Sequence, residues 1–288
     1  MLLQILFDSL LLAGLLAVGA LGFTLVWGVL NVLNLMYPAF IMFGAYISYG
    51  LWHLGVDFLV TIPITIALLF CIGWCMQRFV LDYVINGPHT SSITLTYGLN
   101  LMAVGLALYL FTAVDRSIVV PAYLDGYMQV AGVKLPYVRV VAVAIAGLLT
   151  AATWWFFDRT EYGAAIRATR MDADAAQLVG VRVRTIYNLT TALSAALAGA
   201  MGSLVALVFS AQPTVGDHFF IQIIIVTVLG GLGSIIGPLV GALVIGVATS
   251  VTTHLAGPTY GILVGTLIVL VVLAVRPTGL LGKRFYEA

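Results

Sequence analysis

The chain has 288 residues, of which 62% are apolar and 8% are charged, and its mean hydropathy is +1.14. A soluble globular domain carries about 25% charged residues, so the composition excludes that class. The formal net charge of +1 offers no basic surface for nucleic acid. We expect residues 1–288 to form a single transmembrane domain.

Stretches without a formal charge mark the expected membrane crossings, because a spanning helix needs about 20 apolar residues. The amino-terminal residues lack the basic region of a signal peptide and are expected to continue into the first span. The expected spans are residues 9–30, 37–52, 58–77, 91–112, 138–157, 186–209, 218–232, 236–253 and 259–275. The sequence therefore predicts an all-α polytopic membrane protein of about nine spans, some of them short or broken.

Basic residues predict the orientation, since Lys and Arg concentrate in cytoplasmic loops. Of the 12 Lys and Arg residues, nine fall on the side that carries residues 158–184 and the carboxyl terminus, and three fall on the other side. We therefore expect residues 158–184 and the carboxyl terminus in the cytoplasm. The amino terminus and an outer loop over residues 113–137 are expected outside.

Polar residues separate the first two expected spans, where Asn31, Asn34 and Tyr37 precede Pro38. Proline suits the first turn of a new helix. Broken backbone at membrane depth occurs where it lines a cavity, and broken segments of this kind indicate a transport path. A short turn at the cytoplasmic surface accounts for the same residues equally well, because asparagine favours turns.

Two further spans carry polar candidates for the path. Thr96 and Asn100 share one face of the fourth span, and Gln222 and Thr227 lie in the seventh. Hydrogen bonds between helices would explain such residues as well as a path would.

Glycines and prolines suggest close packing and a repeat. Gly233, Gly237 and Gly241 recur every four residues, a spacing that favours close helix packing. The Tyr37-Pro38 and Gly237-Pro238 starts resemble each other and hint at an internal repeat.

The stretch from Asp158 to Arg184, here called the island, holds nine of the 23 charged residues. Thr160 is expected to cap a first helix with Glu161 in its first turn, and Asp172 to cap a second helix. That second helix is expected to end at Val179, with Gly180 in the left-handed conformation. A weakly apolar stripe is formed by Tyr162, Ile166, Thr169, Ala173 and Ala176, with Arg167, Arg170, Asp172 and Asp174 mostly beside it. A loop needs only about 2–8 residues, so the sequence favours a docking surface for a cytoplasmic partner over a solvated connection.

Several kinds of chemistry have no sequence signal. The chain contains no G-x-x-x-x-G-K-[ST] phosphate-binding motif, and its lysines are Lys134 and Lys283. Its four histidines are isolated, so no metal site is expected. No acidic residue lies centrally in an expected span, which argues against an ion-coupled transporter. We expect energy to come from another polypeptide.

Three regions carry a resemblance to a known family: residues 28–44 (GVLNVLNLMYPAFIMFG), 160–202 (TEYGAAIRATRMDADAAQLVGVRVRTIYNLTTALSAALAGAMG) and 228–246 (VLGGLGSIIGPLVGALVIG). They resemble the shorter of the two permease types of branched-chain (hydrophobic) amino-acid ABC importers. Asp174-Ala175-Ala176 followed by Gly180 looks like the EAA-x-x-x-G loop of ABC importer permeases. The chain departs from the family at Asn34 to Pro38, where Asn-x-Ala-His-Gly is usual.

The resemblance implies a permease subunit that works by alternating access in a bacterial inner membrane, surrounded by membrane lipid. It implies a second related permease subunit, two ATPase subunits that bind ATP and Mg, and an extracytoplasmic substrate-binding protein. The chain itself would be no enzyme and hold no cofactor. The implied coupling helix would use Thr160, Glu161, Tyr162, Ile166, Arg167, Arg170, Asp172, Ala173, Asp174, Ala175, Ala176 and Gly180. The alternatives are a same-family permease for urea, short amides or aromatic acids, and a stand-alone channel or facilitator.

Overall fold

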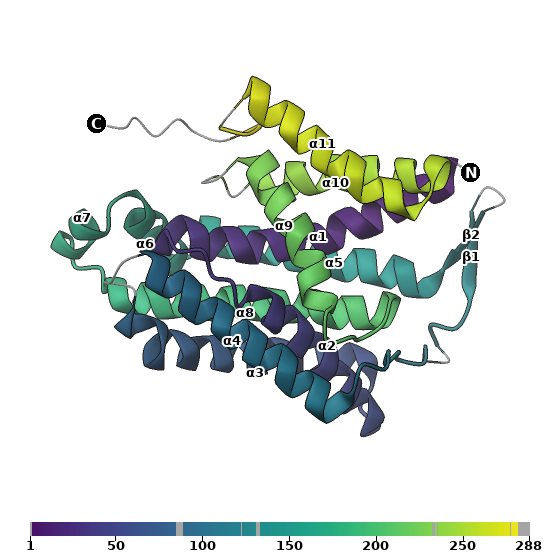
Figure 1. The fold of residues 1–288 in the computed structure, drawn as a ribbon, viewed down its shortest axis with the longest axis horizontal. Coiled ribbons are helices and arrows are strands. Elements are labelled where there is room, and N and C mark those ends of the chain that lie inside the picture. The colour runs from purple at the N-terminus through teal and green to yellow at the C-terminus, as the bar shows by residue number, and fades with distance from the viewer. Residues whose placement is uncertain are drawn as a thin grey trace.

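Two long helices, α1 (Leu2–Leu30) and α8 (Val183–Val208), lie antiparallel at the centre of the molecule (Figure 1). In their most apolar 18-residue stretches, 83% of the residues of α1 and 89% of those of α8 are buried, against 17–33% in the other long apolar helices. The computed structural model describes residues 2–84, 89–121, 123–130, 133–231, 234, 236–276 and 278–281. The other described elements are α2 (Tyr37–His53), α3 (Phe58–Phe79), the 3-10 helix η1 (Leu81–Tyr83), α4 (His89–Phe111), β1 (Tyr127–Val130), β2 (Val133–Pro136), α5 (Tyr137–Arg159), α6 (Glu161–Met171), α7 (Ala173–Leu178), α9 (Val215–Gly230), α10 (Gly237–Ala256) and α11 (Pro258–Val275).

The chain is a largely helical polytopic membrane protein. Within the described ranges, six helices are long and apolar enough to cross a membrane: α1, α3, α4, α5, α8 and α10. The three other expected spans coincide with the shorter helices α2, α9 and α11, of 17, 16 and 18 residues. The count of nine spans stays a prediction.

The molecule has two distinct ends along its long axis (Figure 1). One end carries α6 and α7 and is called the island end. The other end carries the start of α1 and the antiparallel strands β1 and β2, and is called the hairpin end. The hairpin lies in the expected outer loop, so this loop contains a small sheet that an all-helical prediction did not include.

The chain turns back into the molecule after α1, over residues 31–36, here called the first break. Asn31 ends α1 with a φ of 51°, a conformation that asparagine tolerates. Tyr37, the first residue of α2, donates its hydroxyl to the Gly19 carbonyl at 2.6 Å. Gly19 lies about 17 Å before the end of α1 at a rise of about 1.5 Å per residue. Helix α2 therefore begins deep inside the molecule.

A second break, residues 209–214, follows α8 on the side of the hairpin end, whereas the first break follows α1 on the side of the island end. Its Ala211 exchanges two backbone hydrogen bonds with Arg116 of the outer loop, at 2.7 and 3.0 Å. Helix α9 then begins at Val215 and runs across the long axis of the molecule, from α2 to α10 and α11 (Figure 1). A Cβ on Gly216 would collide with the Pro38 carbonyl oxygen. The starts of α2 and α9 are therefore in contact.

The two breaks belong to two units of opposite direction, α1–α2–α3 and α8–α9–α10. Each unit packs its third helix on the first helix of the other. A Cβ on Gly73 of α3 would lie 2.6 Å from Ala195 Cβ of α8, and one on Gly246 of α10 would lie 2.7 Å from Ala13 Cβ of α1. The repeat hinted at by the sequence paired the start of α2 with that of α10, whereas the structure matches α2 with α9.

Candidate functional site

One face of α4 contacts both the first break and the start of α9. Thr96 Oγ1 accepts a hydrogen bond from the Leu35 amide at 3.2 Å and donates to the Ser92 carbonyl at 2.8 Å. One turn further on, Asn100 Nδ2 donates to Asp217 Oδ1 at 3.3 Å. These contacts hold the first break and the start of α9 beside one helix.

Asn34, Thr96, Asn100 and Asp217 are here called the central polar site. Asn34, Thr96 and Asn100 are at most 4% exposed, and Asp217 is half-buried. Asn34 Oδ1 accepts from the Met36 amide at 3.0 Å, which shapes the turn into α2. Asn34 Nδ2 and Asn100 Oδ1 are buried without a hydrogen-bond partner. Buried polar atoms are normally paired, so these two atoms are unusual.

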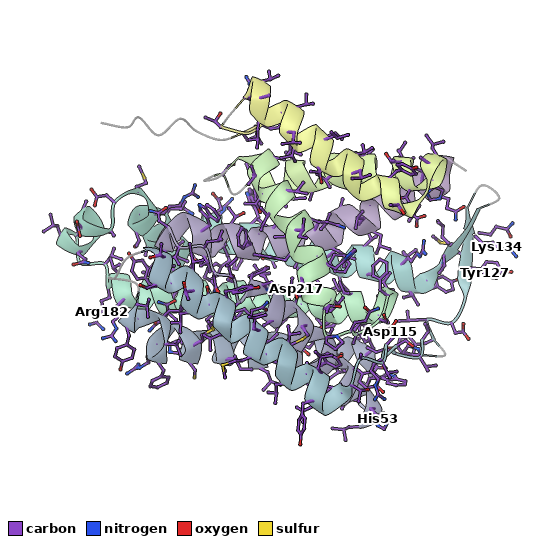
Figure 2. The ribbon with its side chains drawn as sticks, viewed as in Figure 1. His53, Asp115, Tyr127, Lys134, Arg182 and Asp217 are labelled. Carbon is purple, nitrogen blue, oxygen red and sulfur yellow. The ribbon has the colours of Figure 1, made fainter. Side chains whose placement is uncertain are left out.

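The central polar site lies midway between the ends of the molecule. Asn100 is the twelfth of the 23 residues of α4. Asp217 lies between Arg182, at the island end, and Asp115, at the hairpin end (Figure 2). Asp217 stands at the start of α9 and not centrally in a span, as expected, but the start of α9 itself lies midway along the molecule (Figure 2).

The depth of Asp217 follows from the second break. The charge-free stretch over residues 185–216 is 32 residues long, well above the roughly 20 that one span needs. Its surplus folds back into the molecule and carries Asp217 inward. The surplus length of this stretch was therefore the feature of the sequence that could have predicted the inward position of Asp217.

The remaining path candidates occupy different places. Tyr37 is fully buried, and its ring packs edge-on against Phe23, with ring centroids 5.6 Å apart. Gln222 is buried with Oε1 unpartnered, and Thr227 Oγ1 lies 3.5 Å from Thr24 Oγ1. Asn31 is exposed where α1 ends. The structure thus gathers Asn34, Tyr37, Thr96 and Asn100 around the breaks and leaves Asn31 at the surface.

The local structure of the island follows its sequence. Thr160 Oγ1 accepts from the Gly163 amide at 3.0 Å and caps α6. Asp172 Oδ1 accepts from the amides of Asp174 and Ala175 at 2.9 Å and caps α7. Gly180 follows with a φ of 89°. The predicted caps and the predicted left-handed glycine are confirmed.

The apolar stripe of the island faces the protein interior. Ile166 and Ala176 are 2% and 3% exposed, and Thr169 is also buried. Ile166 packs in a cluster with Leu25 and Phe157. The interpretation of this stripe as a free docking face is wrong for these three residues, because α1, α5 and α8 already cover the inner face of α6, and α8 contacts α7.

Other apolar residues of the island are exposed. Met171, Leu178 and Val179 are 83%, 89% and 78% exposed, and Tyr162 is 58% exposed. Glu161, Asp174 and Ala175 are exposed, whereas Arg167 and Ala173 are half-buried. Sequence periodicity did not single out Met171, Leu178 or Val179, because they lie at the ends of short helices.

Arg170 ties α6 to the end of α1. A Cβ on Gly28 would lie 3.2 Å from Arg170 Nε, so the guanidinium lies directly on that glycine. Burial lowers the pKa of Arg170 below its usual value. A cation at this position also suits the negative end of the α1 dipole.

The predicted glycine contacts lie between α9 and α10. A Cβ on Gly237 would lie 2.5 Å from the Gly230 carbonyl oxygen, and one on Gly241 would collide with the Val226 carbonyl oxygen. Gly233 lies outside the described residues.

Comparison with known proteins gives a consistent match over the whole chain. Residues 5–272 match the family described as branched-chain amino acid transport system, permease component. The chain is 26% identical over 305 aligned residues to the high-affinity branched-chain amino acid transport system permease protein LivH of Escherichia coli, covering 99% of this chain and 97% of LivH. The permease protein BraD of Pseudomonas aeruginosa gives the same identity and coverage.

A solved structure shares the fold. PsaBC from Streptococcus pneumoniae, solved in complex with Fab, superposes with a TM-score of 0.53 and 14% identity, covering 96% of this chain and 97% of that chain.

Proposed function

The chain belongs to the family of permease components of branched-chain amino acid transport systems, and from this premise we propose that it carries a branched-chain or similar hydrophobic amino acid across the membrane as one subunit of an ATP-driven importer. The full-length similarity to LivH and BraD supports this substrate class. The protein is a transport subunit rather than an enzyme.

The contact between the starts of α2 and α9 at mid-depth carries the proposal. Inverted units with broken helices and polar residues near the membrane midplane are typical of transporters that work by alternating access. The path would run beside Asn34, Tyr37, Thr96, Asn100, Gln222 and Thr227, with Asn31 at its cytoplasmic mouth. Rocking of one unit against the other would open the path on alternate sides.

The energy for this motion would come from two separate ATPase subunits that bind ATP and Mg. A second related permease would complete the path, and an extracytoplasmic binding protein would deliver the substrate at the hairpin end. The assembly would lie in a bacterial inner membrane with the amino terminus outside. The Arg116–Ala211 hydrogen bonds support a role for the outer loop, since they link it directly to the segment that leads into α9.

The ATPase would dock on the exposed residues Met171, Leu178 and Val179, here called the island tip. Exposed apolar side chains on a short helix suit a groove on a partner protein. Ile166 and Arg170 anchor α6 on α1, so a displacement of the island tip would reach α1 through direct contacts.

The double substitution of Leu178 and Val179 by Asp tests the coupling surface. Loss of buried anchors costs more than about 2 kcal/mol, or roughly 30-fold in affinity. We expect the ATPase to co-purify poorly and substrate-stimulated ATP hydrolysis in reconstituted vesicles to fall accordingly. Arg182→Ala is the matched control, because Arg182 is exposed at the same end without capping α8 through its side chain.

Normal co-purification and normal uptake by the folded double variant would contradict the coupling surface. Uptake by the parent chain in the absence of any ATPase would contradict the larger proposal. That second result would instead indicate a stand-alone facilitator.

A further inference from the structure

Asp217 is a carboxylate midway along the molecule (Figure 2) that has no cationic partner among the described residues. It is the third residue of α9 and accepts its hydrogen bond from Asn100, at the midpoint of α4. Across the described part of the chain, the ion pairs of aspartate involve Asp8, Asp82 and Asp158 but not Asp217. A charged side chain near the centre of a membrane is energetically costly. Such a group normally serves a function or has a partner.

The start of α9 explains how the carboxylate is tolerated. As the third residue of α9, Asp217 lies in the first helical turn, where the helix dipole stabilises a negative charge. The dipole does not explain Asn100. An ionised carboxylate only accepts hydrogen bonds, so Asn100 must turn its Nδ2 toward Asp217. Its Oδ1 is then left buried, at a residue 4% exposed, with no donor.

Asp217 and Asn100 together therefore present acceptors that lack a donor. The group that would satisfy both is a cation with several N–H bonds. Asp217 is half-buried and its neighbours Thr214 and His218 are exposed, so this cation can approach from the side of α9. A hydrophobic amino acid offers one such group, its α-ammonium, which carries three donors.

We infer that the Asp217 carboxylate and Asn100 Oδ1 bind the α-ammonium group of the transported amino acid. This inference rests on the proposed function, because it requires cargo that carries an ammonium group. It makes Asp217 a specificity-determining residue that selects amino acids over carboxylic acids with the same side chain. Asn100 then contributes one acceptor and holds Asp217 in place.

The first experiment uses the reconstituted assembly with its binding protein loaded with leucine. Asp217→Asn keeps the size of the side chain and an acceptor for Asn100 but removes the charge. We expect ATPase co-purification to be unchanged and leucine uptake per ATP hydrolysed to fall at least about tenfold, or roughly 1.4 kcal/mol. Asp125→Asn, which removes an exposed charge in the outer loop, is the control and should keep the parental ratio.

Leucine uptake by a folded Asp217→Asn assembly at the parental ratio would overturn the inference and leave the proposed function intact. Absence of ATP-dependent leucine uptake in the parent would instead overturn the proposed function, and with it this site.

A second experiment needs no variant. Labelled leucine bound to the parent assembly without the binding protein is competed with 3-methylbutylamine, which keeps the ammonium, or with 4-methylpentanoate, which lacks it. We expect the amine to compete and the acid to be at least tenfold weaker. Equal competition by the acid would overturn the inference even if Asp217→Asn fails to fold.

Discussion

The side chain of Asp57 connects helix α3 to the outer loop at the hairpin end. Its Oδ1 accepts from the Leu59 amide at 2.9 Å and so caps α3. The same atom accepts from the Tyr123 hydroxyl at 2.7 Å, which ties the outer loop to α3. Desolvation, together with this hydrogen bond and the charge of Asp57, raises the pKa of Tyr123 from 10.0 to about 12.

This contact predicts a loss of order in the outer loop at high pH. A raised pKa means that the folded state favours the protonated phenol. The stabilisation is complete below the ordinary pKa of 10.0 and is lost as the pH rises through about 12. The tyrosinate absorbance of the parent minus that of Tyr123→Phe should titrate near the higher value, and Asp57→Ala should shift it toward the ordinary one. A Tyr123 titration unaffected by Asp57→Ala would show that the hydrogen bond does not form.

The structural roles of single residues could be predicted from the sequence where they depend only on neighbouring residues. Thr160, Asp172 and Gly180 act within one helical turn of themselves, so their residue types sufficed to predict the caps. The position of Asp217 could not be predicted in this way, because it depends on long-range contacts. Ala211 pairs with Arg116 of the outer loop, and Asp217 accepts from Asn100 of α4, 117 positions earlier in the chain. A count of charges per span places such a residue at the membrane surface.

At the scale of elements, the contact between α9 and α10 depends on glycines, which have no side chain to separate the two backbones. Gly241 lies against the Val226 carbonyl of α9, which is backbone and cannot turn aside. Close approach of helices through small residues is the main source of packing free energy in a membrane, where lipid removes the hydrophobic drive between helices.

Gly241→Leu should therefore destabilise the assembly by about 1–3 kcal/mol, as overpacking does in protein cores. Gly105→Ala is the control, because no heavy atom lies within 4 Å of a Cβ at Gly105 in α4. That control should be neutral or stabilising by up to about 1 kcal/mol, since alanine favours helix. The midpoint of thermal unfolding of the purified protein measures both. An unchanged midpoint for Gly241→Leu would mean that α10 is displaced from α9 in the membrane.

Helix positions were predictable, and helix depths were not. Runs of apolar residues located α3, α4, α5, α8 and α10 to within three residues at either end, and the end of α1, whose start they placed seven residues too late. The same runs made α2 and α9 look like ordinary spans, because hydropathy reports composition and not the point where a helix begins. The contact between Gly216 and Pro38 that defines both starts joins residues from different units, and no local pattern encodes it.

At the scale of the whole molecule, the two ends differ in charge and should face different compartments. Gln129 in β1 and Asp174 in α7 are both exposed, one at each end. With Cys71 and Cys75 replaced by serine, Gln129→Cys should react with an impermeant thiol reagent added outside intact cells. Asp174→Cys should react only after the cells are opened. Labelling of both from outside would contradict the predicted orientation.

Helix α3 packs on α8 of the other unit, so the first unit cannot complete its packing until α8 has been synthesised. Ser48 of α2 donates to Ser203 of α8, 155 positions later, and Gln77 of α3 accepts from Thr191, 114 positions later. While the ribosome is still making the island, these groups lack their partners on α8 and keep only their bonds within the first unit, Ser48 with Thr65 and Gln77 with Asp82. Polar groups with too few partners are costly in hydrocarbon. The first unit is therefore inserted well before it is folded. We therefore expect a chain cut short after α5, which lacks α8, to be less stable in the membrane than the full chain.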